Sequence, residues 1–186
     1  MKYPLHYYGD PILREKTVPV AEVTDEIRAL SDDMIETLHS ENGIGLAAPQ
    51  IGRRESLCVV YVPGEYDVDE EGHRLNPDAA MPMVLINPEI TEPSDIQAAR
   101  DEGCLSIPDI YAEVVRPYEI RVRYLDREGV SRDERYRGLV ARVIQHEVDH
   151  LNGILFIDRI SHVKKIALRG RLKRLRRETE ERFKPA

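Results

Sequence analysis

Residues 145–150, Gln-His-Glu-Val-Asp-His, limit what this chain can fold into more than any other stretch. On a helix, His146 and His150 project from one face about one turn apart, so both imidazoles can reach a single metal ion. Glu147 points roughly 100° round the helix from His146. We therefore expect it to flank the ion without binding it, where a carboxylate can take a proton from metal-bound water.

The flanking residues favour a buried helix. Two apolar stripes and one polar face follow helical spacing: Leu139, Val143, Val140, Ile144, Val148 and Leu151 are apolar, whereas Arg142, Gln145, Asp149 and Asn152 are polar. Apolar residues on more than half of the circumference are typical of a helix inside a protein. Gly153 is predicted to mark the C-terminal end of this helix. The alternative is a core helix whose two histidines are hydrogen-bonded and bind no metal.

A metal site needs a third ligand, and the sequence narrows the choice. The longer form of this motif has a third histidine where Phe156 stands here. A downstream glutamate would have to come from the basic C-terminal segment, expected to be exposed: Glu178, Glu180 or Glu181. Upstream, residues 102–108 present Cys104 in a glycine-containing turn, and a thiolate with two imidazoles leaves a fourth position for water. Alternatively, Cys104 is a buried structural thiol.

Residues 43–50, Gly-Ile-Gly-Leu-Ala-Ala-Pro-Gln, contain small residues that let the backbone approach a ligand closely. They superficially match the dinucleotide-binding fingerprint, which requires a strand before it and a helix after it. Here a helix is predicted before it and Pro49 interrupts the segment after it, so we exclude a dinucleotide site. Gln50 could instead offer side-chain N–H groups to an oxyanion. The alternative is a plain connector between a helix and a strand.

The remaining patterns predict an α+β fold with mainly antiparallel sheets around the central metal-binding helix. A helix capped by Thr24 or Asp25 is expected over residues 25–40, and a basic final helix over 162–183 or 184. Strands are expected near residues 56–62, 83–87, 112–115, 119–126 and 130–136. The acidic segment 64–82 is predicted to form an exposed loop or a loose hairpin. At 186 residues, we expect one catalytic domain spanning 1–186.

Charge and composition narrow the class of protein. Apolar residues make up 41% and charged residues 33% of the chain, as in ordinary globular proteins. No run approaches the roughly 18 apolar residues of a membrane span, and the first residues lack a signal-peptide core, so cytoplasm is expected. Cys58 lies in an apolar run and is interpreted as core filler.

The net charge of −7 is unevenly distributed between the body of the protein, which is acidic, and the C-terminal segment, which is basic. Residues 162–186 carry ten Lys or Arg against three Glu, which leaves 17 basic and 31 acidic residues in the remainder. A basic tail on an acidic body can contact something anionic. A solvated amphipathic helix packed on the body is the simpler interpretation.

Three stretches together resemble the peptide deformylase family: residues 43–50, residues 102–106 (Glu-Gly-Cys-Leu-Ser) and residues 145–151 (Gln-His-Glu-Val-Asp-His-Leu). Their order and spacing match the family. Residues 9–14 and 85–89 are also similar, so the resemblance covers about residues 3–160. Some members have an arginine shortly after the second motif, where this chain has Ile110 and Tyr111.

The resemblance implies a hydrolase that removes the N-formyl group from the initiator methionine of newly made polypeptides and releases formate. It implies a metal held by Cys104, His146 and His150, and acid–base work by Glu147. The oxyanion would be held by the Gln50 side chain and the Leu105 backbone N–H. The family ion is Fe²⁺, one per chain, with Zn²⁺, Ni²⁺ or Co²⁺ as substitutes, whereas ligand type alone favours zinc.

Several further expectations concern the surroundings of this site. Ile44, Val143 and Ile144, with Gly45 beside them, could form the walls of a methionine pocket; simple core packing is the alternative for the three apolar residues. Glu102 could orient a ligand histidine, and Asp149 could pair with a buried arginine such as Arg116. An enzyme that acts on nascent chains works near ribosomes, so the basic helix could bind ribosomal RNA.

Two other functions compete with deformylation. A metallopeptidase or another amidase could use the same metal and carboxylate. A non-catalytic metal-stabilised module is the third hypothesis, against which Glu147 and Gln50 argue, because a structural site needs neither and usually has four protein ligands. We expect a monomer that needs no membrane.

Overall fold

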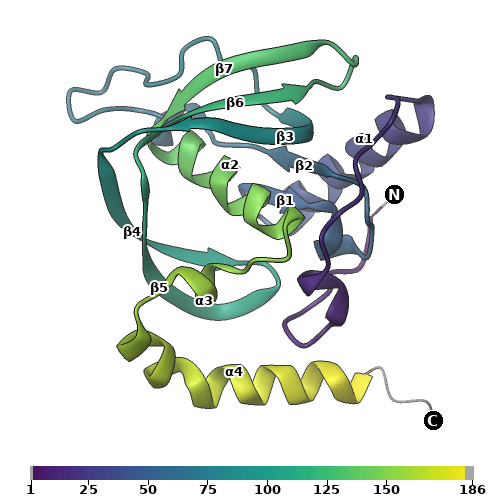
Figure 1. Ribbon diagram of the computed structural model, residues 1–186, viewed down its shortest axis with the longest axis vertical. Helices are drawn as coiled ribbons and strands as arrows, with labels where there is room; N and C mark the ends of the chain where they lie inside the picture. Colours follow the sequence, from purple (N-terminus) through teal and green to yellow (C-terminus); the bar gives the residue numbers. More distant parts are fainter. Residues whose placement is uncertain (1, 183–186) are drawn as a thin grey trace.

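The computed structural model describes residues 2–182. Within that range an antiparallel five-stranded sheet and a two-stranded ribbon enclose a central helix, α2 (Figure 1). The sheet has the order β1 (Gly45–Ala47), β2 (Leu57–Val60), β3 (Met83–Pro93), β6 (Glu119–Leu125) and β7 (Ser131–Arg137). The ribbon pairs β4 (Gln97–Cys104) with β5 (Ile107–Pro117). The predicted α+β class with mainly antiparallel sheets is confirmed.

Helix α2 (Gly138–Leu151) lies between the sheet and the ribbon (Figure 1). Its apolar stripes pack on one face of the sheet, where Val140 and Ile144 join a buried cluster with Cys58 and Leu85. The helix ends as predicted, because Gly153 adopts a positive φ of 72°. The predicted burial of the helix extends to its polar face, because Arg142, Gln145 and Asp149 are buried against the ribbon.

The opposite face of the sheet is covered by α1 (Asp25–Ser40), which Thr24 caps as predicted. Leu30, Met34 and Leu38 pack there against Leu57 and Ile86. Strand β2 is therefore buried on both faces, which explains its unbroken apolar run. Cys58 lies within it, fully buried as core filler.

Several strand predictions need correction. Strand β4 was not predicted, because half of its residues are exposed and the strand shows no apolar alternation. Strands β3 and β5 are longer than expected, and residues 45–47, read as part of a connector, form β1. The segment 64–82 holds a short 3₁₀ turn, η3 (Gly64–Tyr66), and is anchored near the start of α2, where Asn76 Nδ2 donates to the carbonyl of Arg137 at 3.1 Å.

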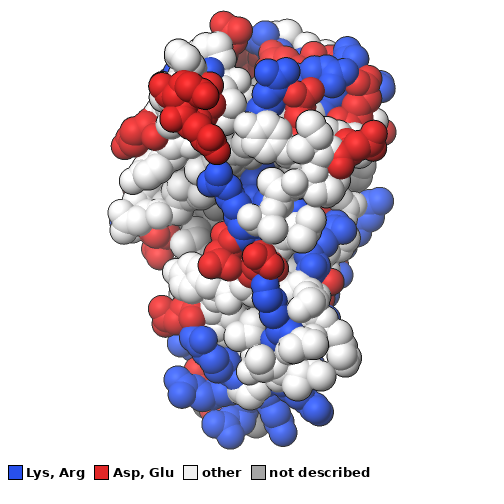
Figure 2. Space-filling view, turned by 90° about the vertical axis from the view of Figure 1, so that its left-hand side faces the viewer, with Lys and Arg blue, Asp and Glu red and all other residues white. Residues whose placement is uncertain are grey.

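After α2 come α3 (Phe156–Arg159) and the long helix α4 (His162–Arg182). Leu168, Leu172 and Leu175 of α4 pack on the ribbon and the N-terminal segment. Phe183, predicted on the same side, lies outside the described residues. Lys and Arg gather at the end of the molecule formed by α4 (Figure 2). Among residues 2–182, no helix combines the length and apolarity needed to cross a membrane.

Candidate metal centre

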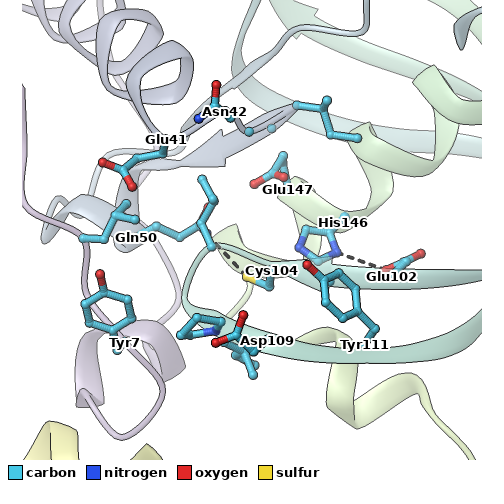
Figure 3. A pocket seen from close by; sticks show the side chains of 18 of the residues that line it. Tyr7, Glu41, Asn42, Gln50, Glu102, Cys104, Asp109, Tyr111, His146 and Glu147 are labelled. Carbon is cyan, nitrogen blue, oxygen red and sulfur yellow. Dashed lines mark hydrogen bonds and ion pairs between the residues drawn. The ribbon is translucent and has the colours of Figure 1, made fainter.

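The three predicted ligands come together from two elements. Strands β4 and β5 are joined by a tight turn, in which Cys104 pairs with Ile107, and this turn brings the thiol over α2. Cys104 Sγ lies 3.2 Å from His150 Nε2, and one ligand atom from each of Cys104, His146 and His150 lies within 4.8 Å of the others. Cys104 precedes both histidines by more than forty residues in the sequence. The β4–β5 ribbon brings it next to them in the fold (Figure 3).

The two imidazoles are held differently. His146 Nδ1 donates to Glu102 Oε2 at 3.0 Å, which turns Nε2 toward the thiol side of the site. The Phe156 ring stacks on the other side of His146, with ring centroids 6.2 Å apart. Burial lowers the pKa of His150 well below its usual value, so its ring is neutral, as metal binding requires.

The chemistry of this donor set fits a divalent cation. Metal–sulfur bonds of about 2.3 Å and metal–nitrogen bonds of about 2.1 Å, arranged tetrahedrally, separate ligand atoms by roughly 3.6 Å. Burial alone would lower the pKa of His146, but hydrogen bonds to Cys104 and Glu102 outweigh it and raise the pKa well above its usual value. A bound cation would take the place of that proton on the His146 ring, because metal ligands must be deprotonated.

Glu147 lies beside the ligands and not among them. It is buried, and its Oε2 atom has no hydrogen-bond partner among the described residues. Burial raises the pKa of Glu147 to about 7. A carboxylate with a free oxygen and a pKa near neutrality is suited to accept and return a proton.

Gln50 reaches the thiol from the opposite side of the cleft (Figure 3). Its Oε1 atom accepts the backbone N–H of Ala47 at 2.8 Å, which fixes the amide. Its Nε2 atom then points to Cys104 Sγ at 3.5 Å and Ser106 Oγ at 3.2 Å. Leu105 directly follows Cys104 in the turn. The two groups predicted to stabilise an oxyanion thus both lie next to the thiol.

The site opens into a cavity of about 740 Å³, and His150 is not among its lining residues. Ile44, Gly45 and Val143 line it as predicted, together with Cys104, Leu105, His146, Glu147 and Gln50. Ile144 does not line it: the side chain is fully buried in the core cluster, so its predicted place in the pocket wall is corrected. Segment 64–82 contributes no lining residue.

One wall of the cavity was not predicted from the sequence. Helix α4 contributes Leu175, Glu178, Thr179 and Arg182. The leucines of α4 repeat at helical spacing and predicted that the helix packs on the body, but nothing in that pattern shows which surface receives it. The N-terminal segment forms part of the surface on which α4 packs. The two backbones approach closely at Gly9, because a Cβ there would lie 2.9 Å from the carbonyl oxygen of Arg176.

Comparison with known proteins identifies the family. A family model described as polypeptide deformylase matches residues 2–166. The chain belongs to the peptide deformylase family. The peptide deformylase of Salinibacter ruber is 47% identical over 176 residues, covering 94% of this chain and 89% of the relative. That of Rhizobium meliloti is 47% identical over 162 residues, covering 87% of each chain.

Solved structures agree with this assignment. Peptide deformylase from Ehrlichia chaffeensis has a TM-score of 0.84 at 36% identity, covering 96% of this chain and 98% of that one. The enzyme from Synechococcus elongatus, in complex with actinonin, has a TM-score of 0.79 at 39% identity, covering 93% and 85%. As a peptide deformylase, the chain is an enzyme that removes the N-formyl group from nascent peptides. The hypothesis of a non-catalytic module is therefore wrong.

In this deformylase a buried ion network lies under the ligand helix. Glu102 accepts from Arg116 at 2.6 and 2.9 Å and from Arg142 at 2.6 Å, and Arg116 also donates to Asp149 at 2.8 Å. Arg159 extends the network to the surface through Asp149. The predicted pairs of Glu102 with a ligand histidine and of Asp149 with Arg116 are both present, whereas the roles of Arg142 and Arg159 were not predicted.

The network explains how a buried carboxylate can stay ionised beside the candidate metal site. Burial alone would raise the pKa of Glu102, but hydrogen bonds from His146 and Arg116 outweigh it and hold the pKa far below its usual value. An ionised Glu102 accepts the proton of His146 Nδ1 and so selects one tautomer of this histidine.

Proposed function

We propose that this chain is an iron-dependent peptide deformylase in which Cys104, His146 and His150 hold one Fe²⁺ ion. The observation that supports this proposal is their convergence in one cleft, beside a buried carboxylate oxygen of Glu147 that has no partner among the described residues. Ligand chemistry alone would also suit Zn²⁺, and Ni²⁺ or Co²⁺ are plausible substitutes. The choice of iron follows the family.

The proposed chemistry divides between the ion and the protein. When bound, the ion supplies a Lewis acid that polarises the formyl oxygen and acidifies water. Glu147 accepts a proton from the attacking water and returns it to the departing amine, a role worth typically 10²–10⁴ in rate. Gln50 Nε2 and the Leu105 N–H donate to the oxygen on which negative charge develops.

The cleft also supports selection of formylmethionine. Ile44, Gly45 and Val143 line it close to the ligands, and we assign them to the pocket for the methionine side chain. Gly45 leaves room for Glu147, because a Cβ there would overlap its Oε1 atom. A formyl carbon carries only hydrogen, so a site this closely packed excludes an acetyl group on size.

Glu147→Ala tests the proposal. The variant should keep its metal, because Glu147 is not a ligand, while formate release from formyl-Met-Ala-Ser falls by about 10³-fold or more. Metal content by elemental analysis under anaerobic conditions and formate release are measured on the same sample. The unmodified enzyme should leave acetyl-Met-Ala-Ser and free Met-Ala-Ser intact. Cleavage of either would support a broader amidase or a metallopeptidase.

We also propose that α4 binds ribosomal RNA through its outward face, so that the enzyme acts in the cytoplasm as a monomer on nascent formyl-Met polypeptides. Arg169 and Lys173 are exposed and have no ion-pair partner within residues 2–182. Because α4 also lines the cleft, deleting it would disturb catalysis, and point substitutions give a cleaner test.

The variant Arg169→Glu/Lys173→Glu should weaken salt-sensitive ribosome binding in co-sedimentation. Lys16→Glu/Arg123→Glu applies the same charge change to the body of the protein and should bind as the unmodified enzyme does. Equal binding by both variants would contradict a role for α4.

A further inference from the structure

The cavity extends well beyond the metal ligands. Cavities of 300–1,000 Å³ accommodate whole drug-sized ligands, so about 740 Å³ leaves space for peptide residues that follow methionine. The far part of its lining comes from the N-terminal segment, the end of α1, strands β4 and β5, and α4. We call this part the outer cleft and define it by Tyr7, Glu41, Asp101, Asp109 and Arg182.

Three carboxylates of the outer cleft are exposed and have no partner among residues 2–182. The side chains of Glu41, Asp101 and Asp109 form no hydrogen bond or ion pair with any described residue. Glu178, a fourth acid in the lining, is in contrast paired with Arg174 at 3.1 Å. In Figure 3 Glu41 lies above Gln50 and Asp109 lies below it.

The outer cleft already holds one cation of the chain itself. The guanidinium of Arg182 lies over the Tyr7 ring, 5.4 Å from its centroid, which is within range of a cation–π interaction. The other arginine of the cavity lining, Arg142, is buried and satisfied by Glu102. Tyr111, two thirds exposed, offers a second aromatic surface at the opening. This environment therefore has a demonstrated capacity to receive a guanidinium.

We propose that the outer cleft selects substrates with cationic side chains in the residues that follow formylmethionine. The inference rests on the deformylase activity and adds a specificity to it. Among residues 2–182, three unpaired carboxylates face Arg182 and Arg171, whose guanidinium contacts the backbone carbonyl of Asp109, so negative charge remains in excess along the outer cleft. In a cleft such a field attracts cations and repels anions. Removing Arg182 should strengthen the preference, whereas removing acids should weaken it.

The experiment compares kcat and KM for formyl-Met-Lys-Lys, formyl-Met-Glu-Glu and formyl-Met-Ala-Ser with the metal-loaded enzyme. At low ionic strength kcat/KM should be about tenfold higher for the Lys peptide than for the Glu peptide, mainly through KM. The ratio should approach one as salt shortens the screening length. Formate release from the neutral peptide separates failure of the deformylase assignment from failure of the selectivity.

Three variants assign the effect to the outer cleft. Glu41→Gln/Asp109→Asn should lower the Lys-to-Glu ratio at least threefold, and Arg182→Gln should raise it. Asn suits position 109 because its φ of 60° lies in the left-handed region that Asn tolerates. Glu65→Gln/Glu70→Gln removes two acids outside the cavity lining and should leave the ratio unchanged. A ratio near one in the unmodified enzyme, or equal ratios in all variants, would overturn the proposal.

Discussion

The carboxylate of Glu147 lies directly against Gly45. A Cβ built on residue 45 would overlap Glu147 Oε1 and would lie 2.7 Å from Val143 Cγ1. Strand β1 and helix α2 can therefore approach this closely only if residue 45 has no side chain. The glycine fixes where the proposed general base can sit.

Gly45→Ala should consequently reduce kcat and also lower stability. The methyl group displaces the Glu147 carboxylate, and it also meets Val143, whose branched side chain is stiff. We expect kcat to fall at least about tenfold, because positioning errors near 1 Å can cost 10² in rate. Gly170→Ala is the matched control: a Cβ there meets nothing within 4 Å. It should keep full activity and gain about 0.5–1 kcal/mol in unfolding free energy.

The substitution Gln50→Glu keeps the hydrogen-bond acceptor of the Gln50 side-chain amide and removes its N–H donor. The new carboxylate can still accept the Ala47 N–H, which Gln50 Oε1 accepts at 2.8 Å, but it loses the donor aimed at the thiol side. Loss of an oxyanion donor costs about 10²–10³ in kcat. Steady-state formate release measures this loss, and Ser106→Ala, which removes only a hydroxyl near Gln50 Nε2, should cost far less. A Gln50→Glu enzyme within a few fold of normal would exclude Gln50 as an oxyanion donor.

Arg116→Leu should destabilise the protein severely. The guanidinium is 4% exposed and serves both Glu102 and Asp149, so its removal leaves two buried carboxylates without their main partner. Breaking a buried ion pair from one side costs about 3–5 kcal/mol. Arg159→Gln removes the half-exposed end of the same network and should cost less than about 1 kcal/mol. Denaturant unfolding of the metal-loaded variants compares the two, and similar costs would contradict this account.

The hydroxyl pair of Tyr124 and Tyr136 predicts a loss of stability in alkali. The two oxygens lie 2.9 Å apart, and burial, followed by the contacts with Glu134, raises the pKa of Tyr124 to about 12. The folded state thus keeps a proton that the unfolded chain loses near pH 10, so this stability is complete below pH 10 and declines as pH rises toward 12. The decline should be about 2 kcal/mol.

Denaturant unfolding between pH 9 and 11.5 measures this slope. Tyr124→Phe/Tyr136→Phe should flatten it, because neither group can then titrate. Tyr66→Phe changes a tyrosine that is 63% exposed and should leave the slope as it is. Parallel slopes in all three proteins would show that the buried pair does not contribute.

Local patterns predicted helices α1 and α2 well, because both repeat apolar residues at helical spacing. The two histidines four apart on α2 pointed to the candidate metal site. Strand β4 escaped detection since its stability comes from pairing with β5, and its own residues, such as Arg100 and Asp101, give no apolar alternation. Arg142 was placed on the polar face of α2, but no partner was predicted for it. Its partner Glu102 lies forty residues earlier, and only the fold brings the two together.

The place of α4 in the cleft was beyond sequence reasoning for a related reason. Leu172 and Leu175 predicted a buried side, but the surface they pack on combines the N-terminal segment with β5. Helical spacing describes one element at a time, whereas docking depends on surfaces from distant parts of the chain. Ile144 illustrates the same limit inside α2. It is buried in the core, whereas its neighbour Val143 lines the cavity, and the apolar pattern of the helix does not distinguish the two positions.

The most direct test of the account is X-ray absorption at the iron edge of anaerobically prepared, active enzyme. It should give about one iron per chain, one sulfur neighbour near 2.3 Å and two nitrogen neighbours near 2.1 Å. In Cys104→Ser the sulfur neighbour should disappear and formate release should fall with it. An active enzyme whose iron has no sulfur neighbour, or that releases formate without any metal, would contradict the assignment of Cys104, His146 and His150 as the ligands.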